Sequence, residues 1–139
     1  MEENKIVNGE AAAPVVQLSA TDSLGVAQYA VKVLDARKGH NIKLLHVEEQ
    51  TTIADYFVIC TGNSRTQVNA LADEVEFKLE EAGLTPLRKE GGATGVWTLL
   101  DYGAVIIHVF GREGREFYNL EKLFDAGVEV DIKDLLTEN

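Results

Sequence analysis

Residues 56–67, Y-F-V-I-C-T-G-N-S-R-T-Q, carry the clearest fold signal in this 139-residue chain. Its first five residues form a continuous apolar run, which is typical of a strand buried on both faces. The turn signal T-G-N follows, and Ser64 then stands three residues before Gln67, the spacing of a capping box at the start of a helix. A buried strand that leads through a short turn into a capped helix predicts an α/β (α+β) fold, in which helices pack on a sheet.

Apolar periodicity on both sides of this stretch predicts the other elements. Spacings of three and four residues indicate one helix that ends at Gly39 and a second that runs from Ser64 to Gly83. A last helix is expected over 117–126. The expected strands lie at 42–47, 56–60, 86–89, 96–100 and 105–110. Together these elements predict a mixed sheet of about five strands with packed helices.

The last two strands are expected to form a hairpin with Tyr102-Gly103 as its two-residue turn. The pairs that follow from this turn are Leu100–Val105, Leu99–Ile106 and Trp97–His108. One face of the hairpin then carries Trp97, Leu99, Ile106, His108 and Phe110, whereas the other face is aliphatic apart from Thr98.

This aromatic face has two interpretations. Trp97, His108 and Phe110, with Arg112 and Arg115 just beyond, could pack beneath a helix. The aliphatic face, however, needs the helices more, which would leave the aromatic face partly open. Aromatic side chains beside arginine are typical of a protein-binding hot spot. Composition alone favours neither interpretation.

The net charge of −10 is uneven along the chain, with 15 carboxylates against 11 cations in residues 21–124 and the remaining excess at the two ends. We expect residues 1–20 to be a flexible extension, 21–124 the folded domain, and 125–139 an acidic tail. Within the tail, Val128, Val130 and Ile132 alternate as in a short strand. The excess of carboxylates argues against nucleic-acid binding by broad phosphate neutralisation, which needs surplus Lys and Arg.

The cellular setting follows from what the sequence lacks. No apolar run approaches the roughly 20 residues that span a bilayer, and the N-terminus shows no basic region followed by an apolar stretch. The single cysteine, Cys60, rules out an internal disulfide. We therefore expect a cytoplasmic protein without membrane contact.

Two features near the start of the second predicted helix have the residue types of a chemical site. The turn before Ser64 could hold an anion at a helix N-terminus, but a plain cap is favoured because the lysine of a P-loop is absent. A nucleotidyl-transfer reaction would need paired carboxylates for metal ions. The nearest acidic cluster, Asp73, Glu74 and Glu76, has the pattern of a solvated helix face.

Nucleophilic and metal chemistry are equally weakly supported. Cys60, His108 and Asp101 are the residue types of a nucleophile set, but Cys60 ends a buried run, which favours a structural role. His40, His46 and His108 lack the spacing of metal ligands. No catalytic residue, metal or cofactor is expected.

Three blocks at ordered spacing carry a resemblance to a known family. They are A-D-Y-F-V-I-C-T-G-N-S-R-T-Q-V-N-A-L-A-D at 54–73, E-G-G-A-T-G-V-W-T-L-L-D-Y-G-A-V-I-I-H-V-F at 90–110, and R-E-F-Y-N-L-E-K-L-F at 115–124. Together they resemble the Iojap family, the ribosomal silencing factors RsfS, over roughly 22–124. Phe124 departs from the pattern, since the family often has Trp there.

The resemblance implies a binding protein rather than an enzyme, with a fold similar to nucleotidyltransferases but without their catalytic carboxylates. Members dock on the large ribosomal subunit at large-subunit protein fourteen, block association with the small subunit, and damp translation when nutrients fall. Little direct contact with rRNA is expected, and self-association of the isolated chain stays open.

The residues that recur in the family, carried over by position, include the aromatic face and its neighbours. They are Asp55, Ser64, Arg65, Gln67, Glu90, Gly91, Trp97, Asp101, His108, Phe110, Arg115, Tyr118 and Glu121. The expected docking residues are Trp97, Leu99, Asp101, Tyr102, His108, Phe110 and Arg115. A nucleotide-binding or nucleotidyltransferase-like enzyme and a general dimerisation scaffold remain the alternatives.

Overall fold

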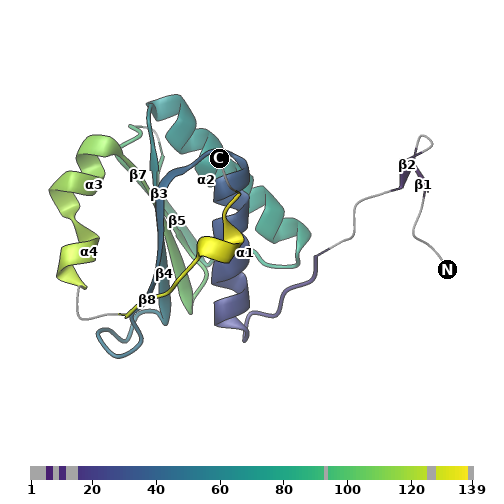
Figure 1. The fold of residues 1–139 in the computed structure, drawn as a ribbon, viewed down its shortest axis with the longest axis horizontal. Coiled ribbons are helices and arrows are strands. Elements are labelled where there is room, and N and C mark those ends of the chain that lie inside the picture. The colour runs from purple at the N-terminus through teal and green to yellow at the C-terminus, as the bar shows by residue number, and fades with distance from the viewer. Residues whose placement is uncertain (1–5, 8–9, 12–15, 93, 125–127, 138–139) are drawn as a thin grey trace.

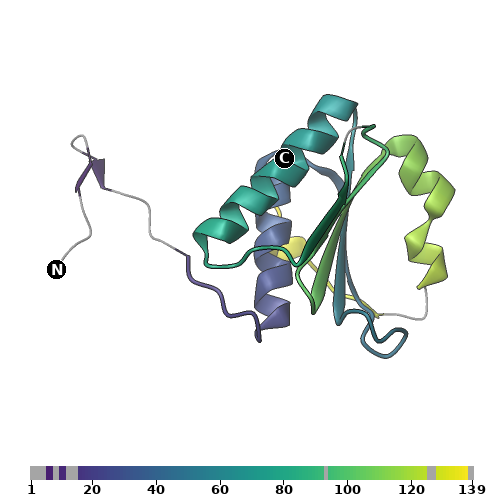
Figure 2. The same cartoon turned by 180° about the vertical axis from the view of Figure 1, so that it is seen from behind.

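A six-stranded mixed sheet separates two layers of helices (Figure 1). The computed structural model describes residues 6–7, 10–11, 16–92, 94–124 and 128–137. The helices are α1 (Ser23–Ala36), α2 (Arg65–Glu81), α3 (Arg112–Tyr118) and α4 (Leu120–Leu123), with a 3₁₀ turn η1 at Lys133–Leu135. The strands of the sheet are β3 (His40–His46), β4 (Tyr56–Gly62), β5 (Arg88–Gly91), β6 (Trp97–Asp101), β7 (Val105–Gly111) and β8 (Val128–Glu129). Helices α1 and α2 cover one face, and α3 and α4 cover the other (Figure 2).

The strand order β5-β6-β7-β4-β3-β8 places the two most apolar strands at the centre. Strands β4 and β7 pair in parallel, and every other described pair in the sheet is antiparallel. Both central strands are buried along nearly their whole length, as expected for continuous apolar runs covered on both faces. The predicted fold class is confirmed, with six strands in this sheet where about five were expected.

The predicted capping box holds the start of α2. The Ser64 hydroxyl accepts a hydrogen bond from the backbone N–H of Gln67 at 3.1 Å. The Gln67 side-chain oxygen accepts one from the backbone N–H of Asn63 at 2.6 Å, one residue before the usual partner. Both ends of the short loop after β4 are therefore tied to the first turn of the helix, which fixes the direction in which α2 leaves the sheet.

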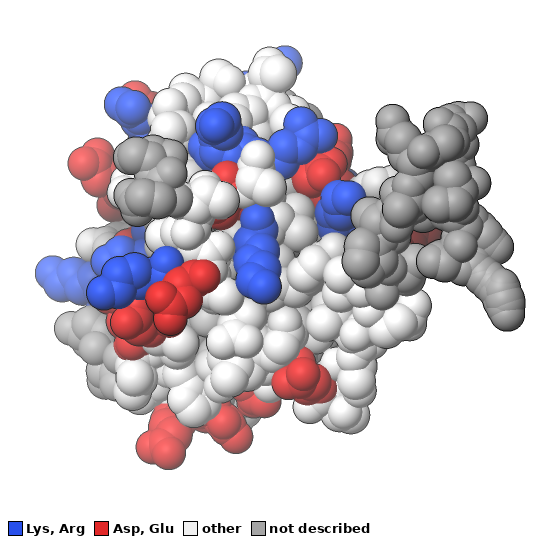
Figure 3. Space-filling view, turned by 45° about the vertical axis from the view of Figure 1, so that its right-hand side comes forward, with Lys and Arg blue, Asp and Glu red and all other residues white. Residues whose placement is uncertain are grey.

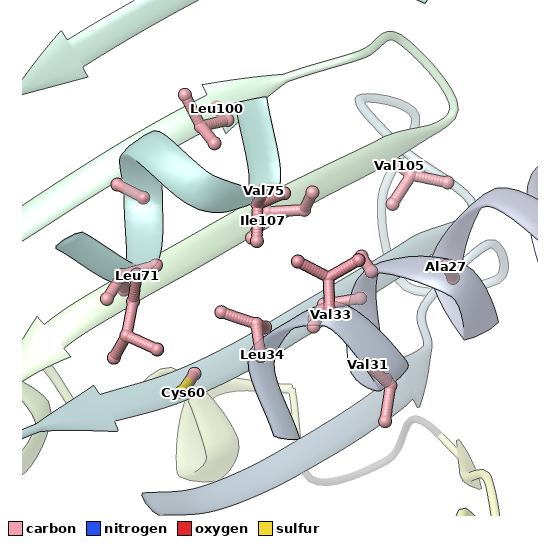
Figure 4. Packing of buried hydrophobic residues seen from close by; sticks show 14 of the residues in the cluster. Ala27, Val31, Val33, Leu34, Cys60, Leu71, Val75, Leu100, Val105 and Ile107 are labelled. Atoms are coloured by element: carbon pink, nitrogen blue, oxygen red, sulfur yellow. The ribbon is translucent and has the colours of Figure 1, made fainter. Parts of the chain in front are cut away.

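The main core lies between the helices α1 and α2 and the sheet (Figure 4). Leu34 on α1 and Leu71 on α2 are fully buried against Cys60 on β4. Val75 lies over Ile107 on β7, so the two helices share one apolar layer. The helical spacing in the sequence is thus explained by burial against the central strands.

The register of the β6–β7 hairpin differs from the one predicted. Leu99 pairs with His108 and Trp97 pairs with Phe110, a shift of two residues from the expected partners. The loop is longer than a two-residue turn, and within it the Asp101 carboxylate accepts a hydrogen bond from the Gly103 N–H at 2.8 Å. Since side chains alternate with a period of two, an even shift leaves the predicted faces intact.

The C-terminal elements also differ from the prediction. The single helix expected over 117–126 is two short helices joined at Asn119, whose φ of 47° lies in the left-handed region and breaks the helix. Residues 125 and 126 of that prediction lie outside the described residues. Beyond them, β8 pairs with Leu45 and His46 of β3.

The described part of the expected acidic tail is docked on the domain. Ile132 is 8% exposed, and Val130 and Leu135 pack against the main core. The backbone N–H of Val130 donates to the Leu44 carbonyl at 2.8 Å. The segment 128–137 therefore closes the β3 side of the core.

At the other end of the chain, β1 (Ile6–Val7) and β2 (Glu10–Ala11) form a two-stranded antiparallel pair. Leu18 packs against the main core, and its N–H donates to the Ala82 carbonyl at 3.1 Å. Much of the expected extension, 1–5, 8–9 and 12–15, lies outside the described residues. In the part that the structure describes, no helix has the length and apolarity to cross a membrane.

Candidate protein interface

The aromatic face of the hairpin lies beneath α3 and α4. A second apolar cluster forms there, and its members come from β3, β4, β7 and α4 with the intervening loop. They are Leu45, Val47, Ala54, Phe57, Ile59, Ile106, Phe110 and Leu120, with Trp97, Leu99 and Phe124 partly buried beside them. The molecule thus has three layers, and this face is largely a second core.

The seven expected docking residues occupy different depths. Phe110 is fully buried, and His108 and Arg115 are 3% and 9% exposed. Trp97 and Leu99 are half-buried on the same face of β6. Asp101 and Tyr102 lie at the opposite end of the hairpin, where Tyr102 packs against the main core under α1 and α2. The structure brings four of the seven together, namely Trp97, Leu99, His108 and Phe110.

Trp97 connects the buried and exposed parts of this face. Its ring stacks on Phe110 with 4.9 Å between ring centroids, and it meets the ring of Tyr118 on α3 at a tilt, with 4.6 Å between centroids. Its indole N–H donates to Nδ1 of His108 at 3.1 Å. Trp97 therefore packs against the buried Phe110 on one side and against the more exposed Tyr118 on the other.

Arg115 positions α3 and α4 on the sheet. Its guanidinium donates to both carboxylate oxygens of Glu121 at 3.3 and 2.9 Å. It also donates to the Thr61 hydroxyl at 2.8 Å and to the Asn41 carbonyl. The hydrogen bonds from Arg115 hold the pKa of Glu121 below its usual value. Arg115 thus joins α3, α4, β3 and β4, and its buried guanidinium supports the surface from within.

Asp101 has a local role in the hairpin. Its carboxylate accepts from Gly103 in the turn and lies 3.4 Å from the guanidinium of Arg88 on β5. The residue types of a nucleophile set, which the sequence already disfavoured as a site, do not assemble, because Cys60 belongs to the core under α1 and α2 whereas His108 lies on the other face of the sheet. Burial raises the pKa of the Cys60 thiol to about 12, as expected for a structural cysteine.

The exposed apolar residues of this layer lie on the helices. Phe117 is 79% exposed, Leu123 71% and Tyr118 45%. We call these three residues the α3–α4 surface; the half-buried Trp97 contacts it through Tyr118. Phe117 and Leu123 are not among the predicted docking residues, although the sequence holds a signal for them. Leu120 and Phe124 account for one inward face and leave Phe117 and Leu123 without a place in the core.

The comparisons with known proteins assign the chain to a family. A family model described as "Ribosomal silencing factor during starvation" matches residues 20–139. The ribosomal silencing factor RsfS of Halalkalibacterium halodurans is 37% identical over 110 residues, which cover 79% of this chain and 94% of that protein. The RsfS of Bacillus subtilis is 38% identical over 107 residues, covering 77% and 91%. The chain belongs to the RsfS family.

Plant proteins and solved structures extend this result. The chloroplastic Iojap protein of Arabidopsis thaliana is 32% identical over 111 residues, which cover 80% of this chain and 46% of that protein. A crystal structure of a Chromobacterium violaceum protein has a TM-score of 0.73 at 34% identity and covers 75% of this chain and 87% of that one. A Bacillus halodurans structure has a TM-score of 0.69 at 36% identity, covering 78% and 98%. The resemblance to RsfS and Iojap is confirmed, and the family's role in silencing ribosomes makes this chain a regulator of translation.

Proposed function

We propose that this cytoplasmic protein silences ribosomes by binding the large subunit at large-subunit protein fourteen on the joining face. A folded domain seated there occupies space that the small subunit needs, so translation is repressed under nutrient limitation without any bond being made or broken. The family membership supports a role at the ribosome. The α3–α4 surface supports a protein partner.

The exposure of Phe117 is the observation that carries this proposal. The phenyl ring of Phe117 is 79% exposed and makes an edge contact with Tyr118, with 5.0 Å between ring centroids. It leaves a large apolar area in contact with water unless a partner covers it. Aromatic anchors of this kind supply much of the free energy of protein–protein binding. Of the expected docking residues, Trp97 contacts this surface through Tyr118, Leu99 is partly buried in the second apolar cluster, and His108, Phe110 and Arg115 are buried.

The charge of the chain favours a basic protein over RNA as the main partner. The chain as a whole carries 23 carboxylates against 13 Lys and Arg, and Figure 3, in which the side of α3 and α4 is turned to the back, shows carboxylates along its lower edge. Their field accelerates encounter with a basic ribosomal protein and disfavours approach to rRNA phosphates. We therefore propose little direct contact with rRNA at the docking site.

Phe117→Ser tests the proposed surface. We expect binding to purified large subunits to weaken by about tenfold or more, and inhibition of subunit joining to weaken in parallel. Because the side chain is largely exposed, the free energy of unfolding should change by less than about 0.5 kcal/mol. Co-sedimentation with large subunits measures binding, and light scattering of mixed subunits measures joining.

Leu87→Ser is the matched control, because Leu87 is 76% exposed but precedes β5 at the far edge of the sheet. It should leave binding unchanged. Equal binding by the Phe117→Ser protein and the wild type would show that the α3–α4 surface is not the interface. We further propose that the isolated chain self-associates through this surface, so Phe117→Ser should also shift sedimentation velocity towards the monomer.

A further inference from the structure

The connections of the sheet open a crevice at one end of the molecule. Strands β4 and β7 are parallel neighbours, so their carboxyl ends meet at the same edge. After β4 the chain crosses to α2 on one face, and after β7 it crosses to α3 on the other face (Figures 1 and 2). Adjacent parallel strands whose connections leave in opposite directions create a ligand-binding crevice between them.

The crevice at this switch point has the size of a small-molecule site. Its cavity volume is about 770 Å³, and its walls come from the start of β3, the end of β4 and helix α3. Ligand pockets in proteins commonly enclose roughly 300–1,000 Å³. The cavity differs in composition from the apolar α3–α4 surface, because polar side chains line it.

One wall of the crevice presents hydrogen-bond donors that are held in place. The side-chain amide nitrogen of Asn63 lies 2.8 Å from Nε2 of His40, which leaves Nδ1 as the other polar atom of the ring. Nε of Arg112 donates to the side-chain oxygen of Asn63 at 3.2 Å. Arg112 has no carboxylate within ion-pair distance among the described residues, so its two terminal amino groups are available. Lys43 adds an ammonium group, 3.7 Å from Glu129.

The opposite wall presents acceptors. Glu113 and Glu116 on α3 line the cavity with exposed carboxylates, while Arg115 and Glu121 satisfy each other beneath them. The donors suit one compact anionic group, because an arginine fork matches phosphate oxygens. The two carboxylates disfavour a polyanion but accept hydrogen bonds from hydroxyl or amino groups. The two walls together match a small molecule with one phosphate and several hydroxyl groups.

We propose that this crevice binds a phosphate monoester of a hydroxyl-bearing molecule, with a nucleoside monophosphate as the representative ligand. Arg112, His40 and Lys43 hold the phosphate, and Glu113 and Glu116 accept hydrogen bonds from the hydroxyl groups. The site goes beyond the proposed ribosomal role and does not depend on it, because it lies on the isolated chain and uses none of the residues of the α3–α4 surface.

Titration of the ¹⁵N-labelled full chain with adenosine 5′-monophosphate tests this site. We expect saturable shifts of the Asn41, Asn63 and Arg112 amide signals, and none from the same concentration of adenosine. Arg112→Gln should lower the affinity by about tenfold or more, because a charge-assisted bond to phosphate is lost. Lys122→Gln, an exposed cation on α4 outside the crevice, is the matched control and should leave the affinity unchanged.

Three results would overturn the proposal. They are the absence of saturable shifts up to about 10 mM nucleotide, equal shifts with adenosine, and unchanged affinity of the Arg112→Gln protein. A His40→Asn variant repeats the test without touching Arg112, and its affinity should also fall. Because all readouts use the free protein, failure here leaves the large-subunit experiment untouched.

Discussion

His108 shows how one residue depends on its neighbours. The indole N–H of Trp97 occupies Nδ1, which places the imidazole proton on Nε2. That atom is buried and has no hydrogen-bond partner among the described residues. Burial lowers the pKa of His108 to about 3, so the ring stays neutral in the folded protein.

Lowering the pH should therefore destabilise the fold through His108. The unfolded chain binds a proton at this imidazole below its ordinary pKa of 6.5, whereas the folded chain does not until about 3. The folded state thus loses stability as the pH falls through 6.5, by about 1 kcal/mol between roughly pH 7 and pH 5.5. Urea unfolding at both values measures this loss.

The His108→Asn protein provides the control for that experiment. Asparagine can still accept from the Trp97 indole, but it does not titrate. The variant should be less stable than the wild type at both pH values, because the ring is lost from the second core. Its stability should fall less between them. A loss equal to that of the wild type would assign the pH dependence to other groups.

At the scale of the elements, α3 and α4 depend on one buried arginine. The two helices are short and break at Asn119, so little of their stability comes from their own hydrogen bonds. Arg115 replaces that support through its bonds to Glu121, Thr61 and Asn41. From the sequence, Arg115 is expected to be a docking residue, whereas in the structure it is buried. Nothing in the local sequence pattern shows which strands an arginine on a helix will reach.

Arg115→Met should loosen this layer. We expect a loss of about 3 kcal/mol in the free energy of unfolding, because Glu121 and Thr61 lose their charged partner. Hydrogen exchange should accelerate in α3 and α4 before it does so in α1 and α2. Arg112→Met, an exposed change on the same helix, should cost less than about 0.5 kcal/mol. Unchanged exchange in α3 and α4 would contradict the positioning role.

The sequence left open whether the segment 128–137 packs on the domain. Ile132 is buried against the main core, so Ile132→Ala should cost about 2–3 kcal/mol in urea unfolding. Val128→Ala, at a 62% exposed position on β8, should stay within about 0.5 kcal/mol of the wild type. Equal effects of the two changes would show that this segment does not dock in solution.

At the scale of the whole molecule, the charge sets how binding responds to salt. The net charge of −10 suits a basic protein partner, and contacts of this kind are screened only moderately. We expect affinity for large subunits to fall by less than about tenfold between roughly 50 and 200 mM salt, since many phosphate contacts would cost about 10³-fold or more. A steep loss in a salt series of co-sedimentations would make rRNA the main partner.

The order and type of most elements, the capped start of α2, the faces of the hairpin strands and the family of the chain could all be predicted from the amino-acid sequence. These follow from local chemistry, because a cap depends on neighbouring residues and strand faces alternate whatever the register. The burial of Phe110 and His108 and the exposure of Phe117 and Leu123 became clear only from the three-dimensional packing. A periodic apolar pattern shows that one face of an element must be buried, but it does not identify the element that packs on that face. That depends on how α3 and α4, held by Arg115, lie across strands distant in sequence.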